Sequence, residues 1–130
     1  MLEVYIDAAS AGNPGPSGIG VYIKGEGHIV KISEPVGITD NHTAEFMALL
    51  RGVQEAEKLS KGFISIRSDS QVVVTAVEKE YVKKEEYKRY LDEALKIANG
   101  FDFFFIKWIR DEENGAADQL AREAIQKNNG

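Results

Sequence analysis

Apolar and polar residues alternate at the start of the chain, and this two-residue period is typical of β-strands. The pattern predicts a first strand over residues 2–6 that ends at Asp7, and a second strand over residues 19–24. Gly25-Glu26-Gly27 has the composition of a hairpin turn, and a third strand is predicted over residues 28–36. Because short connections join these strands, we expect an antiparallel meander.

After Ala44 the apolar period changes to three and four residues, which predicts an amphipathic helix that ends near Lys61-Gly62. Residues 39–41 supply candidate caps for the start of this helix. The rest of the chain predicts a strand over residues 63–68, a helix over 70–76, a helix over 84–98, a strand over 101–109 and a final helix with Asp118 in its first turns.

A strand, a helix and a strand in this order favour a parallel crossover. We therefore expect an α/β fold with a five-stranded mixed sheet, in which three antiparallel meander strands are followed by two parallel strands. Helices should pack on both faces of this sheet. The chain of 130 residues is long enough for one core, so residues 1–130 are expected to form a single domain.

The composition describes an ordinary globular protein, with 43% hydrophobic and 28% charged residues and no cysteine. The formal net charge of −5 argues against a binder that holds nucleic acid through a basic surface, but not against an enzyme that contacts nucleic acid through metal ions. No apolar run approaches the length of a membrane span, and the N-terminus lacks the pattern of a signal peptide. We expect a cytoplasmic protein without a membrane partner.

Four acids stand at similar places in the predicted elements. Asp7 and Asp69 end two strands that should run parallel, and Glu45 and Asp118 lie early in two helices. These positions converge on one edge of such a sheet. Carboxylates gathered there repel one another, and divalent cations remove that repulsion. Oxygen ligands without His or Cys favour Mg²⁺ or Mn²⁺, and two such ions can support phosphoryl transfer. Taken singly, Glu45 and Asp118 are better explained as ordinary acids of a first helical turn.

Four short segments in order along the chain resemble the motifs of the type 1 ribonuclease H family. They are Ile6-Asp7 with Gly12-Asn13-Pro14-Gly15-Pro16, then Asn41-His42-Thr43-Ala44-Glu45, then Ser68-Asp69-Ser70-Gln71, and last Asn114-Gly115-Ala116-Ala117-Asp118-Gln119-Leu120-Ala121. The resemblance covers nearly the whole chain. It implies the ribonuclease H-like fold and endonucleolytic cleavage of the RNA strand of an RNA–DNA hybrid, which leaves 5′-phosphate and 3′-hydroxyl ends.

The resemblance also implies the catalytic residues and the cofactors. Asp7, Glu45, Asp69 and Asp118 match the family's metal-binding carboxylates, with two Mg²⁺ or Mn²⁺ ions. By this carry-over Asp7 bridges both ions, and Glu45 and Asp69 hold the ion nearer the leaving 3′ oxygen. Asp118 supports the ion nearer the attacking water. The sequence points to no obligate protein partner, so we expect a monomer that binds an RNA–DNA hybrid.

Five further residues resemble the family's readers of the substrate sugar: Ser10, Asn13, Asn41, His42 and Gln71. Side-chain amides suit this role, because they pair with a 2′-hydroxyl as donor and as acceptor. Some have an equally simple structural explanation. Asn13 fits a turn, His42 fits a solvated position beside a helix cap, and Gln71 fits an exposed position after a strand. Trp108 is interpreted as core or sheet edge.

The sequence departs from well-known family members at three places. Ala8 stands where glycine is usual, and the basic helix that serves relatives as a hybrid-binding handle is missing. The nearest basic cluster is flanked by acids, and we interpret it as a solvated helix face with paired charges: Lys83, Lys84, Lys88 and Arg89.

The third departure is a short loop before Asp118 that holds no histidine, although many relatives use one there in proton transfer. We expect the substrate phosphate or bulk water to take the proton, with assistance from Glu112 or Glu113, and Asn114 to hold Asp118 by a hydrogen bond. These departures leave one alternative open, a weakly active or inactive hybrid-binding module. Another metal nuclease on the same fold is a second alternative, and the set of Asn13, Asn41 and Gln71 argues against it.

Overall fold

The structure is a computed structural model that describes residues 1–128. It contains a five-stranded sheet and four α-helices, which confirms the predicted fold class. The elements in chain order are β1 Leu2–Ser10, β2 Gly15–Gly25, β3 His28–Thr39, α1 Asn41–Leu59, β4 Phe63–Ser68, α2 Gln71–Lys79, α3 Glu85–Ala98, β5 Phe103–Trp108, the short 3-10 turn η1 Asp111–Glu113 and α4 Gly115–Asn128.

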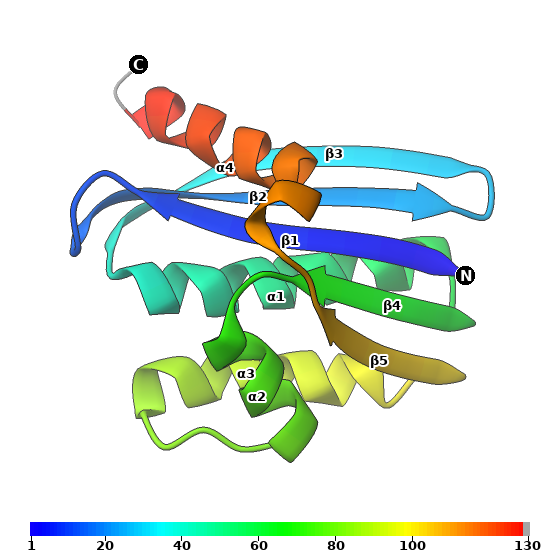
Figure 1. Cartoon of the computed structure of the whole chain (residues 1–130). Helices are drawn as coiled ribbons and strands as arrows, with labels where there is room; N and C mark the ends of the chain where they lie inside the picture. The colour runs from blue at the N-terminus through cyan, green and yellow to red at the C-terminus, as the bar shows by residue number, and fades with distance from the viewer. Residues whose placement is uncertain (129–130) are drawn as a thin grey trace.

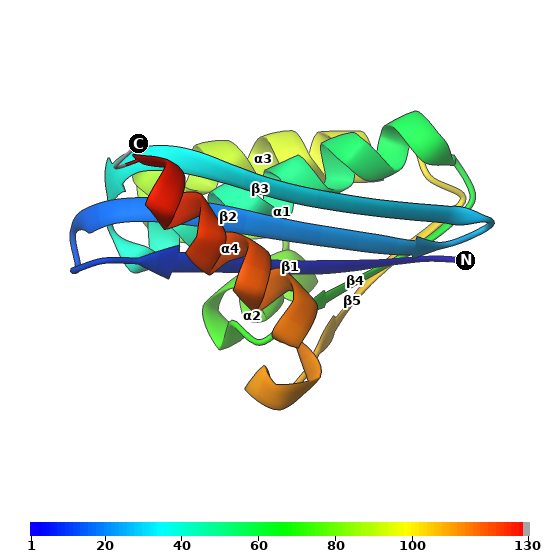
Figure 2. The same cartoon turned by 90° about the horizontal axis from the view of Figure 1, so that it is seen from above.

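The strands lie side by side in the order β3-β2-β1-β4-β5. The first three strands are antiparallel neighbours, whereas β4 runs parallel to both β1 and β5. Helices cover both faces of the sheet: Figures 1 and 2 show α1 and α3 on one face and α4 on the other. Within the described part of the chain, no helix is long and apolar enough to span a membrane.

The main core lies between the sheet and the helices α1, α2 and α3. Leu2, Val4 and Ile6 point to this side from β1, where each is at most 1% exposed. They meet an α1 face that includes Phe46 and Leu49, both completely buried. The residues of β1 that alternate with them face the opposite side of the sheet, and Asp7 is one of these. The alternation that predicts the strand therefore also places Asp7 on the face that α4 shares.

Helix α4 packs against β2 at very short range, because the strand presents glycines and the helix presents alanines. Ala117, Ala121 and Ala124 of α4 are completely buried. A Cβ atom built on Gly20 would lie 2.1 Å from the Ala117 carbonyl oxygen and 2.7 Å from the Ala121 nitrogen. The missing side chains thus allow the helix backbone to rest on the sheet, and this contact fixes the height of Asp118 above Asp7.

Two boundaries matter for the site, and the first of them differs from the prediction. The first strand does not end at Asp7 but continues to Ser10, because residues 7–10 pair with Gly20–Ser17 of β2. Helix α1 begins at Asn41, before the apolar period becomes visible at Ala44, and Asp40, one of the predicted caps, caps it by accepting from the Thr43 N–H. On the side of β1 that faces β4, however, the pairing does end before Asp7. The parallel pairing of β1 with β4 stops at Tyr5, so Asp7 lies just beyond the paired part of these two strands.

We expect Gly20→Ala to destabilise the fold and to displace α4. The added methyl group meets backbone atoms rather than mobile side-chain ends, and such overpacking costs about 1–3 kcal/mol or more. Urea unfolding measures this loss directly.

Gly115→Ala is the matched control, because nothing lies within 4 Å of its Cβ position at the start of α4. It should leave the stability unchanged or raise it by about 0.5–1 kcal/mol. Equal losses for the two variants would contradict the close packing of α4 on β2.

Candidate functional site

The structure brings the four predicted carboxylates together around one cavity of about 290 Å³. They come from four separate elements or their ends: β1, the first turns of α1, the end of β4 and the first turn of α4. We call this the acidic cavity, and its lining residues are Asp7, Ala8, Asn41, Glu45, Asp69, Asp111, Asp118 and Arg122.

Asp7 is the carboxylate most affected by its surroundings. Burial, followed by the charge of Asp69, raises its pKa from the ordinary value of 3.8 to about 8, with smaller contributions from Asp118 and Glu45. The backbone N–H of Ala8 donates to its Oδ1 at 2.9 Å and opposes this rise. When this carboxyl loses its proton, the negative charge it gains is repelled by the neighbouring acids. The cavity therefore favours a positively charged occupant.

Asp69 follows β4 and is held through its backbone. The indole Nε1 of Trp108 donates to the Asp69 carbonyl oxygen at 3.1 Å. Trp108 is 42% exposed on the edge strand β5, so of its two predicted places, core or sheet edge, the sheet edge is correct. The sequence did not predict its hydrogen bond to Asp69. Burial and then the nearby charge of Asp111 raise the pKa of the Asp69 carboxyl to about 6, although Asn114 opposes the rise.

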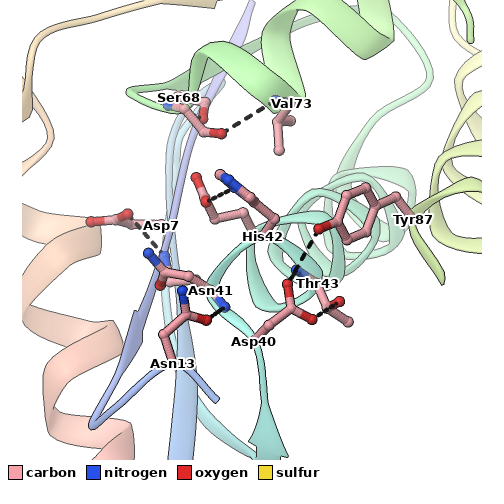
Figure 3. A network of polar contacts seen from close by, with 12 residues as sticks. Asp7, Asn13, Asp40, Asn41, His42, Thr43, Ser68, Val73 and Tyr87 are labelled. Carbon is pink, nitrogen blue, oxygen red and sulfur yellow. Dashed lines mark hydrogen bonds and ion pairs between the residues drawn. The ribbon is translucent and has the colours of Figure 1, made fainter. Parts of the chain in front are cut away.

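Glu45 lies one turn into α1, where its Oε1 is 2.9 Å from Nδ1 of His42. The His42 ring meets the edge of Tyr87 at 6.2 Å between centroids, and the Tyr87 hydroxyl donates to the capping Asp40 at 3.4 Å. Figure 3 shows His42 between this cap and the cavity. His42 is thus half-exposed beside the helix cap, as one interpretation predicts, and it also positions a carboxylate of the cavity.

Asp118 is bound on its outer side by Arg122, whose Nε lies 2.9 and 3.0 Å from the two carboxylate oxygens. The predicted hydrogen bond from Asn114 to the Asp118 carboxylate is wrong. The Asn114 side chain is 1% exposed and donates through Nδ2 to the carbonyl oxygen of Ile6 at 2.9 Å. It therefore joins the start of α4 to the strand residue that precedes Asp7.

The five predicted sugar readers do not all lie in the same place. Asn41 lines the acidic cavity, and its backbone N–H donates to Oδ1 of Asn13 at 3.0 Å, so these two amides stand together beside Asp7. Figure 3 shows Asp7, Asn13, Asn41 and His42 in this group, between β1 and the start of α1. Ser10 is 2.7 Å from the Ser17 hydroxyl across the β1–β2 hairpin. Gln71 begins α2 and lines a separate groove of about 410 Å³ with Val72 and Tyr81.

The loop acids differ from the expectation. Glu112 and Glu113 do not line the acidic cavity but interact with Arg110, whose Nε lies 3.7 and 3.3 Å from their carboxylates. The acid that does line the cavity is Asp111. A run of three consecutive acids gave no sign of which one would face the site, because that choice depends on where Arg110 points.

The donor set fits hard divalent cations. The cavity offers five carboxylates, one amide and no sulfur or imidazole among its lining residues, and such oxygen donors suit Mg²⁺ or Mn²⁺. Among residues 1–128, however, no group of three or more His, Cys, Asp or Glu side chains is arranged closely enough to hold a metal ion as it stands.

Comparison with known proteins adds independent information. Residues 6–124 match the family described as "Reverse transcriptase-like". A candidate hydrolase designated EbsB, from Enterococcus faecalis, is 39% identical over 98% of this chain and 96% of its own length. A ribonuclease HI from Halobacterium salinarum is 32% identical over 95% of this chain, which spans 64% of that relative's length.

Two solved structures have nearly the same backbone. The ribonuclease H1 of Halobacterium salinarum superposes with a TM-score of 0.87 at 31% identity, over 97% of this chain and 98% of that one. LC11-RNase H1, isolated from compost and solved in complex with an RNA/DNA hybrid, superposes with a TM-score of 0.90 at 31% identity over the full length of both chains.

We expect Asp7→Asn to stabilise the protein in the presence of a chelator, and the gain should grow with pH. The folded-state pKa of about 8 lies above the ordinary 3.8, so the folded protein keeps a proton that the unfolded chain releases near pH 4. The free energy of unfolding of the wild type therefore falls as the pH rises from about 4 to about 8, whereas Asn carries no charge to repel.

The two proteins should be equally stable near pH 4. At pH 8 the variant should be more stable by about 1–3 kcal/mol. This range is smaller than the full pKa shift would give, because water reaches part of the Asp7 side chain and weakens the repulsion. Urea titrations at several pH values measure this. Glu112→Gln, at a side chain that is 69% exposed, controls for net charge. A loss of stability in Asp7→Asn at pH 8 would mean that Asp7 is structural.

Proposed function

The chain belongs to the type 1 ribonuclease H family of the ribonuclease H-like superfamily, and from this premise we propose that it hydrolyses the RNA strand of RNA–DNA hybrids with divalent metal ions. The convergence of four carboxylates from four elements on one cavity is the observation that supports this best. Members of this family depend on divalent metal ions. We propose two ions, Mg²⁺ or Mn²⁺, and products with 5′-phosphate and 3′-hydroxyl ends.

The proposed roles of the individual carboxylates are those that the resemblance to the family implies. Asp7 is repelled by all three of the others, which suits a residue that contacts both ions. We assign Glu45 and Asp69 to the ion nearer the leaving 3′ oxygen, and Asp118 to the ion nearer the attacking water. Bound divalent ions would supply an acidified water and would neutralise charge on the phosphate.

Other side chains of this chain hold the carboxylates in position. His42 orients Glu45, Trp108 fixes the backbone of Asp69, and Asn114 ties the start of α4 to β1. Arg122 is bound to Asp118 and keeps that carboxylate at the rim of the cavity. Such supporting contacts reduce the freedom of each carboxylate before substrate arrives, which is how positioning lowers a reaction barrier.

Selection of the RNA strand falls to the two amides beside Asp7. The Asn13 oxygen already accepts from the backbone of Asn41, so the NH₂ group of Asn13 is what this side chain offers to a ligand. Asn41 lines the cavity itself. We propose that this pair contacts the 2′-hydroxyl, the group that distinguishes RNA from DNA. We propose that a single copy of the chain is sufficient for this activity.

The substrate assay uses labelled RNA–DNA hybrid, DNA duplex and RNA duplex, each with Mg²⁺, Mn²⁺ or chelator. We expect cleavage of the RNA strand of the hybrid alone, and only with a metal ion. Asp7→Asn should fold and lose measurable cleavage, whereas Glu112→Gln should cleave as the wild type does. Cleavage of the DNA duplex, or cleavage in chelator, would contradict the proposal.

We expect hybrid binding to depend only weakly on salt. In the basic cluster, Lys88 pairs with Asp92 at 3.6 Å, Lys84 lies over the ring of Tyr87 at 5.4 Å and Arg89 donates to the hydroxyl of Tyr90. Few cations thus face outward to contact phosphates. Each neutralised phosphate contributes about −0.9 to the log–log slope of affinity against salt, so the slope should be shallower than about −3.

Fluorescence anisotropy on a hybrid in Ca²⁺ or chelator, over a range of salt concentrations, measures this slope. A Lys83→Glu and Lys84→Glu double variant tests separately whether the lysines at the start of α3 contribute to this slope. A wild-type slope steeper than about −5, which corresponds to six contacts, would reveal a basic binding surface that the net charge conceals.

A further inference from the structure

The β5–α4 loop carries three acids in succession, Asp111, Glu112 and Glu113, and they have different surroundings. Glu113 is turned back onto Arg110, because its Oε1 accepts from the Arg110 backbone N–H at 3.1 Å and from Nε at 3.3 Å. Glu112 is 69% exposed and lies 3.7 Å from the same guanidinium. Asp111 alone of the three lines the acidic cavity. The guanidinium of Arg110 thus neutralises two of the acids and leaves the third to the site.

The loop is anchored on both sides of Asp111. Before it, the Ile109 N–H donates to the carbonyl oxygen of Ser68 at 2.9 Å, directly beside Asp69. After it, the Asn114 N–H donates to the Asp111 carbonyl oxygen at 2.9 Å, and the Asn114 side chain donates to Ile6, directly beside Asp7. Each anchor therefore joins the loop to a residue that adjoins a carboxylate of the cavity. The position of Asp111 is set by the same strands that set the other ligands.

Asp111 also acts on Asp69 through its charge. The two side chains line the same cavity, and Asp111 is, after burial, the largest of the influences that raise the pKa of Asp69. Carboxylates that share a cavity repel one another, and a cation between them removes that repulsion. The one basic side chain that lines the cavity, Arg122, is bound to Asp118. A divalent cation is the occupant that suits this pair.

We propose that Asp111 is a fifth metal-binding carboxylate, which binds a divalent ion together with Asp69. This inference rests on the proposed function of the acidic cavity and extends its ligand set from four residues to five. Asp111 remains exposed to solvent, so it can bind an ion directly or through one of the waters that Mg²⁺ retains. It differs from Glu112 and Glu113, which the sequence alone favoured for a role in the site.

The test is isothermal titration of the full chain with Mn²⁺ in the absence of nucleic acid, so that the readout is independent of activity. We expect Asp111→Asn to weaken the tighter or the weaker site by about tenfold or more, equivalent to about 1.4 kcal/mol. Glu112→Gln removes the same charge from the adjacent position and should bind within about twofold of the wild type. The comparison separates a ligand from a general change in net charge.

Thermal melts in chelator provide a second readout. Asp111→Asn should melt at or above the wild-type temperature, because it removes a repulsive neighbour of Asp69, whereas a purely structural residue would lower it. Asp7→Asn is the reference for the cavity as a whole. If Asp7→Asn weakens Mn²⁺ binding and Asp111→Asn does not, the fifth ligand is wrong and the proposed function stands. If neither variant weakens binding, the acidic cavity is not the metal site and both proposals fail.

Discussion

Electrostatic repulsion between the carboxylates held in one cavity is the unfavourable interaction that the rest of this fold has to withstand. Asp7 has the clearest sign of it, because burial and three neighbouring acids together raise its pKa to about 8. A chain free to relax would move these groups apart into water. They stay together because each belongs to an element that is fixed by contacts elsewhere, so the fold carries an unfavourable interaction that a divalent cation can remove.

Those fixing contacts are mostly apolar or lie in the backbone. Alternate residues of β1 anchor the strand in the core beneath α1, which leaves Asp7 on the other face. Helix α4 lies directly on Gly18 and Gly20 of β2, and this close packing determines where Asp118 stands. The β5–α4 loop is joined by hydrogen bonds to the ends of β1 and β4. The functional groups thus have little part in stabilising the fold and are positioned by it.

Much of this arrangement can be predicted from the sequence, because the apolar periods determine the strands, the helices and their order. The strand over residues 63–68 was predicted with its exact bounds, and Asp40 was among the candidate caps of the first helix. The continuation of β1 beyond Asp7 was missed, since it depends on pairing with a glycine-rich part of β2 in which no alternation is visible.

The site could be predicted as a set of four carboxylates but not in its supporting contacts. The spacing of His42 and Glu45, and of Asp118 and Arg122, is that of helical neighbours and could have indicated both pairs. The contact of Trp108 with Asp69 joins residues 39 positions apart, and the choice of Asp111 over Glu112 depends on the direction of one arginine. Neither follows from local sequence.

The central claim is that the acidic cavity binds divalent cations, and metal-dependent stability tests it most directly. Thermal melts of the wild-type protein in increasing Mg²⁺ or Mn²⁺ should be compared with melts in NaCl at equal ionic strength. Selective binding to the folded state should raise stability by about 2.7 kcal/mol at a hundred times the dissociation constant, and NaCl should give much less. Equal stabilisation by NaCl and by the divalent salts would contradict the claim.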